Sequence, residues 1–372
     1  MKMLSSWWSP GRVNLIGEHT DYNQGYCLPL AIGRGCTATV SRIDDDVIEI
    51  ESAQRDMPIE VPLSQLRPGA LDAADEWAGH VAGVVWAMRA RGHPVSGLSV
   101  SVDGDLPPGA GLSSSAAMEC AVAAAVNDLL ALGMDQSGLV EVARRAEIEF
   151  VGVPTGGMDQ LASLYGEAGH VLLCDMRSFE VTPIPFDLEA AGLTLLVVDS
   201  RAPHQLTGGL YAQRRNSCEQ AAQLLGVAAL RDLTLEDLPD AVGRLADDRM
   251  RRCTRHVVTE NDRTLAVAQL LGNGQIRAIG PLLTASHESL RDDFEVSVPE
   301  VDLAVEVMLT FGAYGARITG RGFGGCAIAL MEPDQARAAS VGITAAFAGR
   351  NYIPPISFSV TAGAGTHPVE PA

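Results

Sequence analysis

The side chains of this chain that are best suited to chemistry lie close together near its start. The segment reads Gly11-Arg-Val-Asn-Leu-Ile-Gly-Glu-His-Thr-Asp-Tyr-Asn-Gln24, and its candidate binding groups are Arg12, Glu18, His19 and Asp21. A polar group that loses water without gaining a partner costs roughly 1–3 kcal/mol, so these groups either face solvent or share a ligand. Val13, Leu15 and Ile16 can anchor the segment in a core while a turn at Gly17 presents the polar groups at its edge. The spacing favours a ligand site over the alternative, an ordinary polar loop between strands.

A second segment, Leu106-Pro-Pro-Gly-Ala-Gly-Leu-Ser-Ser-Ser-Ala116, follows an alternating strand and opens an apolar helix. Its glycines let backbone N–H groups approach an anion, its serines add hydroxyl donors, and the helix dipole favours negative charge. The segment therefore predicts a phosphate cradle, and a glycine turn with serine caps is the alternative. It is neither a Walker loop, since no lysine follows, nor a dinucleotide fingerprint, since Ser114 stands where the third glycine belongs.

A third segment, Gly152-Val-Pro-Thr-Gly-Gly-Met-Asp-Gln160, places Asp159 near the start of a short helix that Thr155 could cap. The helix dipole and a nearby arginine would keep this carboxylate ionised, which suits it to orient a hydroxyl and accept its proton. A capping or surface aspartate is the alternative.

A literal G-x-G-x-x-G stands at Gly320-Arg-Gly-Phe-Gly-Gly325, but the residues after it read as a strand. A Rossmann turn requires a helix there, so the match does not predict NAD binding. The turn could still close over a nucleotide or form a tight hairpin.

The composition predicts a globular protein of two domains, with 372 residues, 47% of them hydrophobic and 20% charged. The formal charge of −19 argues against nucleic acid as a partner. Lys2 is the only lysine, so the positive charge for a phosphorylated ligand must come from arginine, backbone N–H groups, a helix N-terminus or a metal ion.

Nothing in the sequence predicts a membrane or an oxidising compartment. No segment reaches the roughly 20 continuous apolar residues that a bilayer needs, and the first residues show no signal-peptide pattern. The seven cysteines are scattered, without the close pairs of a zinc site or a disulfide framework. We therefore expect a cytoplasmic protein without a membrane partner.

The hydrophobic periodicity predicts an α+β pattern with a boundary at 182–186. The expected strands are 37–43, 47–50, 98–102, 171–174, 193–198, 316–319 and 326–331. The expected helices are 77–88, 114–132, 139–151, 211–225, 264–271, 275–290, 299–311 and 333–347.

Two residues stand out on these helices. Glu147 falls on the apolar stripe of helix 139–151, whereas Glu149 does not, so a buried carboxylate at 147 requires a cation. Trp77 is most simply a core residue, although its ring could also stack on a purine.

Together, the three segments resemble the motifs of the GHMP kinases. Residues 9–25 resemble the galactokinase signature of that family, and residues 107–116 resemble its phosphate loop. Further similarity lies in the Asp159 segment and in residues 204–215, 289–296 and 317–326, so that it extends from Ser9 to Met331.

The resemblance implies a two-domain α+β fold, with a ribosomal protein S5 domain 2-like fold at 1–178 and a ferredoxin-like α/β sandwich at 179–372. It implies ATP-dependent phosphorylation of the anomeric C1 hydroxyl of α-D-galactose to galactose 1-phosphate, as in the Leloir pathway. The alternatives are another sugar-1-kinase, acting on N-acetylgalactosamine or arabinose, and a sugar and ATP sensor without turnover. The implied state is a monomer or a weak dimer.

The resemblance also implies residue roles. Asp159 would be the catalytic base, and Arg12 would lie beside it and stabilise charge on the phosphoryl group. Sugar binding would fall to Glu18, His19, Thr20, Asp21, Gly156 and Tyr211. ATP binding would fall to Gly109, Ala110, Gly111, Leu112, Ser113, Ser114, Ser115 and Trp77. Mg²⁺ would be held by Ser115 and Glu147, directly or through water.

This sequence departs from the family pattern at three points. Arg321 replaces a glycine often found in the third motif, and Gly157 replaces a bulky aliphatic residue beside the catalytic aspartate. The first motif also begins closer to the start of the chain than in many relatives. Arg321 adds a charge that could alter ATP affinity or face solvent.

Overall fold

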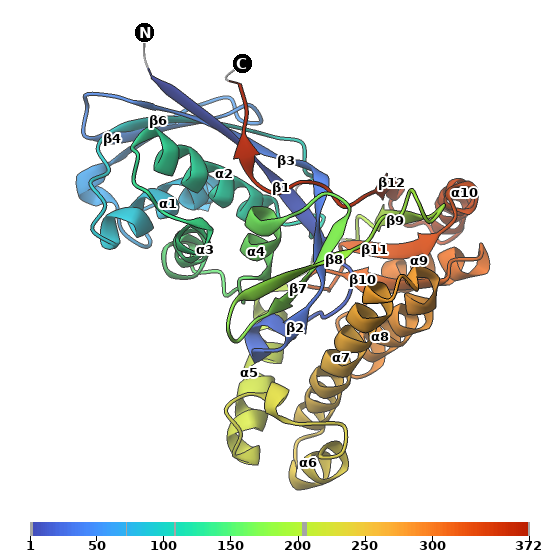
Figure 1. Cartoon of the computed structure of the whole chain (residues 1–372). Helices are drawn as coiled ribbons and strands as arrows, with labels where there is room; N and C mark the ends of the chain where they lie inside the picture. Colours follow the sequence, from blue (N-terminus) through green and yellow to red (C-terminus); the bar gives the residue numbers. More distant parts are fainter. Residues whose placement is uncertain (1–2, 72, 108, 203–206, 371–372) are drawn as a thin grey trace.

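A computed structural model of the chain describes residues 3–71, 73–107, 109–202 and 207–370, and it shows two mixed α/β parts side by side (Figure 1). Four residues of the predicted motifs, Pro108 and residues 204–206, lie outside the described residues. The strands form sheets of six, four and three members within the described ranges.

A six-stranded sheet forms the centre of the first part. Its strands lie in the order β13-β1-β3-β6-β4-β5. Its pairings are antiparallel, except that β4 and β6 run parallel. The expected alternation at 98–102 is confirmed, since Leu98, Val100 and Val102 are buried. The strands are β1 (Leu4–Asn14), β3 (Pro29–Arg42), β4 (Val47–Ser52), β5 (Ile59–Pro62), β6 (Leu98–Gly104) and β13 (His367–Pro368).

Helices α2 (Ser114–Leu129) and α4 (Met158–Tyr165) pack against this sheet, and α1 (Gly79–Ala90) and α3 (Gln136–Arg145) pack against α2. The alanine-rich α2 lies against β1 and β3 and is largely buried, as its composition predicts. The prediction of one α-helix over 139–151 is wrong, because α3 ends at Arg145 and continues as a π-helical turn, Ala146–Val151. Such wider turns are frequent at functional sites.

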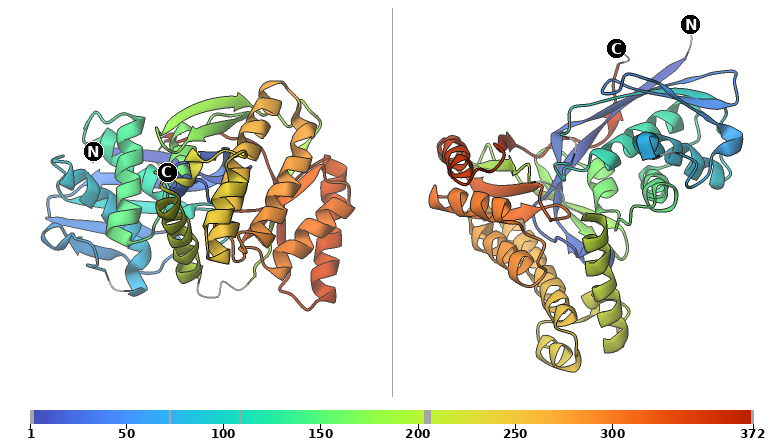
Figure 2. Two further views of the ribbon diagram at one scale, coloured as in Figure 1. Left: turned by 90° about the horizontal axis from the view of Figure 1, so that it is seen from below. Right: turned by 180° about the vertical axis from the view of Figure 1, so that it is seen from behind.

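The four-stranded sheet of the second part is antiparallel, in the order β10-β11-β9-β12. Its strands are β9 (Thr194–Asp199), β10 (Gly315–Thr319), β11 (Cys326–Met331) and β12 (Ile356–Val360). Helices α8 (Gly280–Asp292), α9 (Pro299–Thr310) and α10 (Pro333–Gly349) contact this sheet, and α7 (Asp248–Gly272) extends away from it, as Figure 2 shows from behind. Two helices, α5 (Thr207–Leu225) and α6 (Leu238–Arg244), complete this part.

The prediction of a short helix over 264–271 is wrong in extent, because α7 already begins at Asp248. The buried face of its first half carries the polar residues Thr254, His256, Glu260 and Asn261. An apolar stripe is therefore missing there, and the periodicity does not reveal the helix.

A small sheet of β2 (Tyr26–Cys27), β7 (His170–Asp175) and β8 (Glu180–Pro185) lies between the two parts. The boundary predicted between residues 178 and 179 falls in the turn of the β7–β8 hairpin, and the division at that point stays a prediction. Short 3₁₀ helices lie at Asp21–Asn23, Leu63–Gln65, Ala73–Ala78, Leu230–Asp232 and Ile276–Ile279.

The α+β class is confirmed by these layers. No helix in the described part of the chain has the length and apolar character to span a membrane.

Candidate active site

Arg12 and Asp159 form the centre of the site. Arg12 lies near the end of β1 and Asp159 in the first turn of α4. Arg12 Nε donates to Asp159 Oδ1 at 2.7 Å, and Arg12 Nη2 lies 2.7 Å from the same oxygen. Arg12 Nη1 donates to the carbonyl of Gly111 at 2.6 Å. The arginine predicted to lie beside Asp159 is thus Arg12, and it also fixes the glycine-rich loop.

A cavity of about 400 Å³ opens beside this pair, a size typical of small-molecule sites. Its walls come from segments that are far apart in the sequence. They are Arg12, His80, Gly109, Gly111, Leu112, Ser113, Ser114, Ser115, Glu147, Val153, Asp159, Thr319, Arg321, Gly322, Gly324 and Gly325.

The loop before α2 has the backbone geometry expected of a phosphate cradle. Gly109 and Gly111 both have φ +76, a region that favours glycine. Ser113 is the N-cap of α2, and its Oγ is buried without a hydrogen-bond partner among the described residues. Ala110 differs from its neighbours, since its side chain packs in the core, which leaves only its backbone for a ligand. The loop directs the positive end of α2 into the cavity.

Glu147 lies at the wall of this cavity, only 1% exposed, as its position on the apolar stripe predicts. The cation that it requires is Arg321, whose Nη2 donates to Glu147 Oε1 at 3.2 Å. Ser115 Oγ donates to the same oxygen at 3.2 Å, and Gln160 Nε2 donates to Glu147 Oε2 at 2.8 Å. The sequence patterns do not predict a role for Gln160, although it follows Asp159 directly.

Behind Gln160 lies a second buried carboxylate, Glu119 of α2. Gln160 Nε2 lies 3.1 Å from Glu119 Oε2, and His80 Nδ1 lies 2.7 Å from Glu119 Oε1. Burial, followed by the charge of Glu147, raises the pKa of Glu119 to about 8. Gln160 therefore bridges the two buried carboxylates, and His80 pairs with Glu119.

A smaller cavity adjoins the first on the other side of Asp159. It is lined by Arg12, Glu18, His19, Asp21, Thr155, Met158, Asp159, Tyr211, Gly320 and Arg321. The two cavities share three residues, Arg12, Asp159 and Arg321. A hydroxyl bound in the smaller cavity would therefore meet an anion bound in the larger one at these three side chains.

His19 and Asp21 give the smaller cavity a polar wall. Burial lowers the pKa of His19 to about 3, so its ring is neutral at pH 7. Its Nδ1 lies 2.9 Å from Tyr22 Oη, while its Nε2 is buried without a hydrogen-bond partner within the described ranges. Burial raises the pKa of Asp21 to about 6, so this carboxylate is ionised at pH 7. A neutral ligand with several hydroxyl groups fits such acceptors.

Gly156 and Thr20 support this wall rather than line it. The N–H of Gly156 donates to Asp21 Oδ2 at 3.1 Å. Thr20 is fully buried, and its Oγ1 lies 2.8 Å from Gly17 O and 2.7 Å from Tyr26 O. This position corrects the expectation that Thr20 contacts substrate, because its hydroxyl holds the backbone of the loop.

Gly157, not Thr155, is the N-cap of α4, and Thr155 Oγ1 accepts from the N–H of Gly157.

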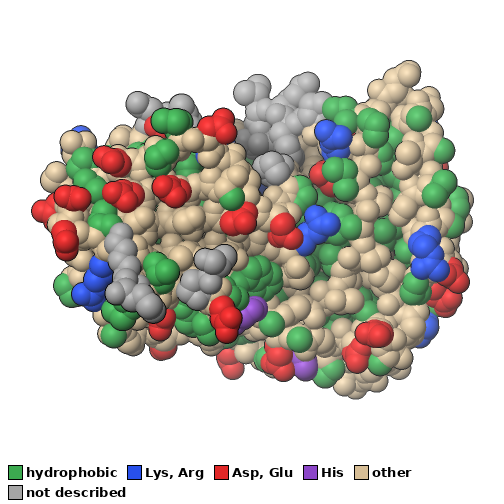
Figure 3. Space-filling model, turned by 90° about the horizontal axis from the view of Figure 1, so that it is seen from above, with side chains coloured by type: hydrophobic (Ala, Val, Ile, Leu, Met, Phe, Trp, Pro, Cys, Tyr) green, Lys and Arg blue, Asp and Glu red, His purple; other side chains and the backbone are tan. Residues whose placement is uncertain are grey.

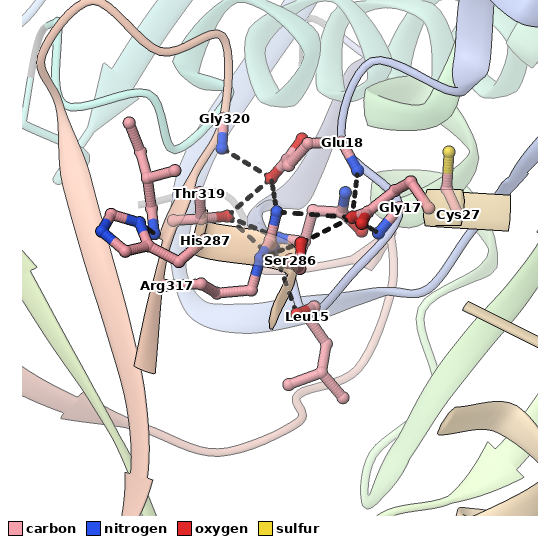
Figure 4. A network of polar contacts seen from close by, with 12 residues as sticks. Leu15, Gly17, Glu18, Cys27, Ser286, His287, Arg317, Thr319 and Gly320 are labelled. Carbon is pink, nitrogen blue, oxygen red and sulfur yellow. Dashed lines mark hydrogen bonds and ion pairs between the residues drawn. The ribbon is translucent and has the colours of Figure 1, made fainter. Parts of the chain in front are cut away.

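The loop that carries Glu18 is held by the second part of the chain (Figure 4). Glu18 Oε1 accepts from the N–H of Gly320 at 2.7 Å and from Thr319 Oγ1 at 3.1 Å. The fully buried Arg317 donates to the carbonyls of Asn14 and Leu15 and lies 3.6 Å from Glu18. These contacts fix Glu18 between the two parts.

Glu260 of α7 also binds the backbone of the loop that carries Glu18. Its Oε1 accepts from the N–H groups of Gly17 and Glu18 and from Ser286 Oγ. Arg263 and other cations overcome the effect of burial and lower its pKa to about 2. The hydrophobic periodicity does not predict Glu260, because the buried face of this half of α7 carries several polar residues.

Trp77 is partly buried and lines a third cavity, of about 470 Å³. This cavity shares His80, Ser114 and Ser115 with the larger cavity of the site. The indole therefore lies where a base attached to bound phosphates could extend.

The donor set at Glu147 fits Mg²⁺, an ion usually bound by one or two carboxylates together with substrate phosphates. Glu147 and Ser115 would supply a carboxylate and a hydroxyl beside the phosphate cradle. A cage of three or more His, Cys, Asp or Glu side chains does not occur among the described residues, so the ligand would have to complete the coordination.

Comparison with known families shows which proteins this chain is similar to. Residues 79–167 match the GHMP kinases N terminal domain, residues 267–349 the GHMP kinases C terminal domain, and residues 5–42 the galactokinase galactose-binding signature. A galactokinase of Streptomyces coelicolor is 47% identical over 96% of this chain and 92% of its own length. A galactokinase of Mycobacterium tuberculosis is 45% identical over 90% of this chain and 91% of its own length.

Comparison with solved structures gives the same result as the comparison of sequences. A Lactococcus lactis galactokinase in complex with galactose has a TM-score of 0.93 and 30% identity, covering 98% of this chain and 95% of that one. A mevalonate kinase has a TM-score of 0.65 at 16% identity and shares the fold alone. The chain belongs to the GHMP kinase family, in its galactokinase branch. The predicted two-domain fold is thereby confirmed.

Proposed function

We propose that this protein transfers the γ-phosphoryl group of ATP to the anomeric C1 hydroxyl of α-D-galactose, giving galactose 1-phosphate and ADP. The observation that carries the proposal is the Arg12–Asp159 pair at the junction of the two cavities. The smaller cavity offers acceptors for sugar hydroxyls, and the larger one offers a glycine-rich loop at a helix N-terminus. The galactokinase relatives support galactose as the sugar.

Asp159 is the proposed base. Arg12 holds its carboxylate by two contacts to Oδ1, which leaves Oδ2 to face the substrate. As the C1 oxygen attacks the γ-phosphorus, its proton passes to Asp159 and the bond from that phosphorus to the β-phosphate oxygen breaks. Because phosphoryl transfer depends mainly on positioning and charge stabilisation, orienting the hydroxyl is as important as removing its proton.

Substrate contacts divide between the cavities. Glu18, His19, Asp21 and Tyr211 would bind sugar hydroxyls, with Gly156 positioning Asp21. Gly109 to Ser115 would surround the phosphates, and Trp77 would flank the adenine. Ser115 and Glu147 would hold Mg²⁺, which neutralises phosphate charge when bound.

The test is to measure ADP release with galactose, N-acetylgalactosamine, arabinose and glucose, and to identify the product by ³¹P NMR. We expect the highest kcat/KM for galactose and a phosphate ester at C1. A preference for another of these sugars would contradict galactose as the substrate. Binding of galactose without ADP release would instead identify a sensor.

The same proposal places the reaction in the cytoplasm, where ATP is available, and requires neither nucleic acid nor a membrane. We further propose a monomer or a weak dimer, because the residues found to line both cavities come from one chain. Sedimentation at working concentrations tests this state.

A further inference from the structure

The site must neutralise several phosphate charges on a protein with a formal charge of −19. Acidic side chains are spread over the face that Figure 3 shows, mainly above the first part of the chain. Lys2 is the only lysine in the sequence, so side-chain cations for the phosphates have to be arginines or histidines. Those lining the larger cavity are Arg12, His80 and Arg321.

Arg12 is poorly placed to donate hydrogen bonds to the phosphoryl group during transfer. Each of its three nitrogen atoms already has a partner, two in Asp159 and one in the carbonyl of Gly111. Its side chain is only 4% exposed. Arg12 therefore fixes Asp159 and the loop. His80 is likewise held by Glu119.

Arg321 differs in each respect. Its side chain is 48% exposed. Within the described residues, its hydrogen bond to Glu147 uses one of its three nitrogens. It stands in the turn between β10 and β11, and its guanidinium lies 5.8 Å from the centre of the Tyr211 ring. It thus lies between Glu147 in the larger cavity and Tyr211 in the smaller one.

We infer that Arg321 is a further catalytic residue, which donates hydrogen bonds to the γ-phosphoryl group during transfer. This inference rests on the proposed function. The place where the two cavities meet is lined by Arg12, Asp159 and Arg321, and the transferring group has to pass there. Asp159 would orient the attacking hydroxyl, and Arg12 holds Asp159. Arg321 is the cation whose remaining N–H groups could donate to the phosphoryl oxygens.

The ion pair with Glu147 holds Arg321 at the edge of the larger cavity in the absence of ligand. Without ligand, the guanidinium compensates a carboxylate that is otherwise buried. If Glu147 held Mg²⁺, the ion would compensate the carboxylate in place of Arg321, and the half-exposed arginine side chain could then turn toward the phosphate oxygens. An arginine in this position suits the task because its planar fork matches phosphate oxygens.

The test compares Arg321→Met, Arg321→Lys and Arg321→Gly with Arg337→Met, which removes the same charge from an exposed position on α10. We expect Arg321→Met to lower kcat on the order of 10²-fold, as the loss of one transition-state donor does elsewhere. Arg321→Lys should retain part of this activity, and added guanidinium ion should partly restore Arg321→Gly. Arg337→Met should match the wild type.

Binding gives a readout that does not depend on turnover. By calorimetry, Arg321→Met should bind adenylyl imidodiphosphate with Mg²⁺ about 10-fold more weakly, while its affinity for ADP with Mg²⁺ should be unchanged. Equal losses for both nucleotides would overturn the γ-phosphoryl contact. Tighter binding of both would show that Arg321 only competes with Mg²⁺ for Glu147, which also overturns it. If the wild type phosphorylates no galactose, the proposed function fails, but the difference between the two nucleotides still decides the role of Arg321.

Discussion

Asp159 Oδ1 and the guanidinium of Arg12 are 2.7 Å apart although 147 positions separate them in the sequence. The contact joins β1 to the first turn of α4 and is almost closed to solvent. Because Arg12 fixes the carboxylate through Oδ1, we propose that the substrate hydroxyl meets Oδ2.

Replacement of Asp159 by Asn should lower kcat by about 10²- to 10⁴-fold, the usual contribution of a general base. Nucleotide affinity, measured by calorimetry, should stay close to that of the wild type. Asp334→Asn, at an exposed position on α10, is the control for loss of one negative charge. An Asp159→Asn enzyme with full turnover would remove the carboxylate from the chemistry.

Glu147→Gln should raise the Mg²⁺ concentration for half-maximal activity by about 10-fold or more, because a metal-site carboxylate is lost. The same shift should appear when Mg²⁺ is titrated into a mixture of enzyme and ADP. Glu149→Gln is the matched control, since Glu149 lies on the exposed side of the same turn and pairs with Arg145. Identical Mg²⁺ dependence in both variants would contradict a metal at Glu147.

Asp21 should make sugar affinity depend on pH. Since burial raises its pKa to about 6, the carboxylate loses its charge below that pH and becomes a poorer acceptor. We expect the KM for galactose to rise as pH falls from 7 to 5, with little change in the KM for ATP. A flat profile for the sugar would argue against contact with Asp21.

The same pKa has a consequence for stability with the opposite sign. The folded-state pKa of about 6 lies above the ordinary aspartate pKa of 3.8, so the group favours folding below pH 3.8 and loses that contribution as pH rises through 6. Asp21→Asn should therefore be more stable than the wild type at pH 8 by about 1–2 kcal/mol, a value that allows for partial exposure. Melting temperatures at pH 5 and pH 8 measure the difference, which should shrink at the lower pH.

Gly156→Ala should impair sugar binding selectively. A Cβ atom at this position would lie 2.3 Å from Asp21 Oδ2, so the carboxylate has to move. We expect the KM for galactose to rise about 10-fold or more, because small displacements of positioning groups are costly. Gly243→Ala, where an added Cβ meets nothing within 4 Å, is the control, and equal KM values in the two variants would refute the argument.

Arg317→Met should destabilise the fold by about 3–5 kcal/mol, because it leaves the buried Glu18 and Glu260 without this cation. Chemical denaturation measures the loss, and Arg337→Met should show almost none. A variant as stable as the wild type would mean that Arg263 alone compensates these carboxylates.

Much of the fold followed from local patterns. The strand at 98–102 was predictable because one of its faces is apolar. The strands at 193–198 and 326–331 and the helix beginning at Ser114 were predictable because they are apolar almost throughout and turn residues bound them. The first half of α7 was not, since its buried face carries His256, Glu260 and other polar groups. Those groups face partners from other elements, which periodicity does not show.

The sequence by itself determined which residues could do chemistry: the polar cluster after Gly11, the glycine-rich loop, Asp159, and Glu147 on its apolar stripe. It also determined that arginine must supply the cations, because lysine is nearly absent. Only the tertiary structure decided which groups meet. It placed Arg12 against Asp159, turned Thr20 inward, and brought Arg321 to Glu147. Residue types fix what a side chain can donate or accept, but the partner is set by packing between strands and helices distant in the chain.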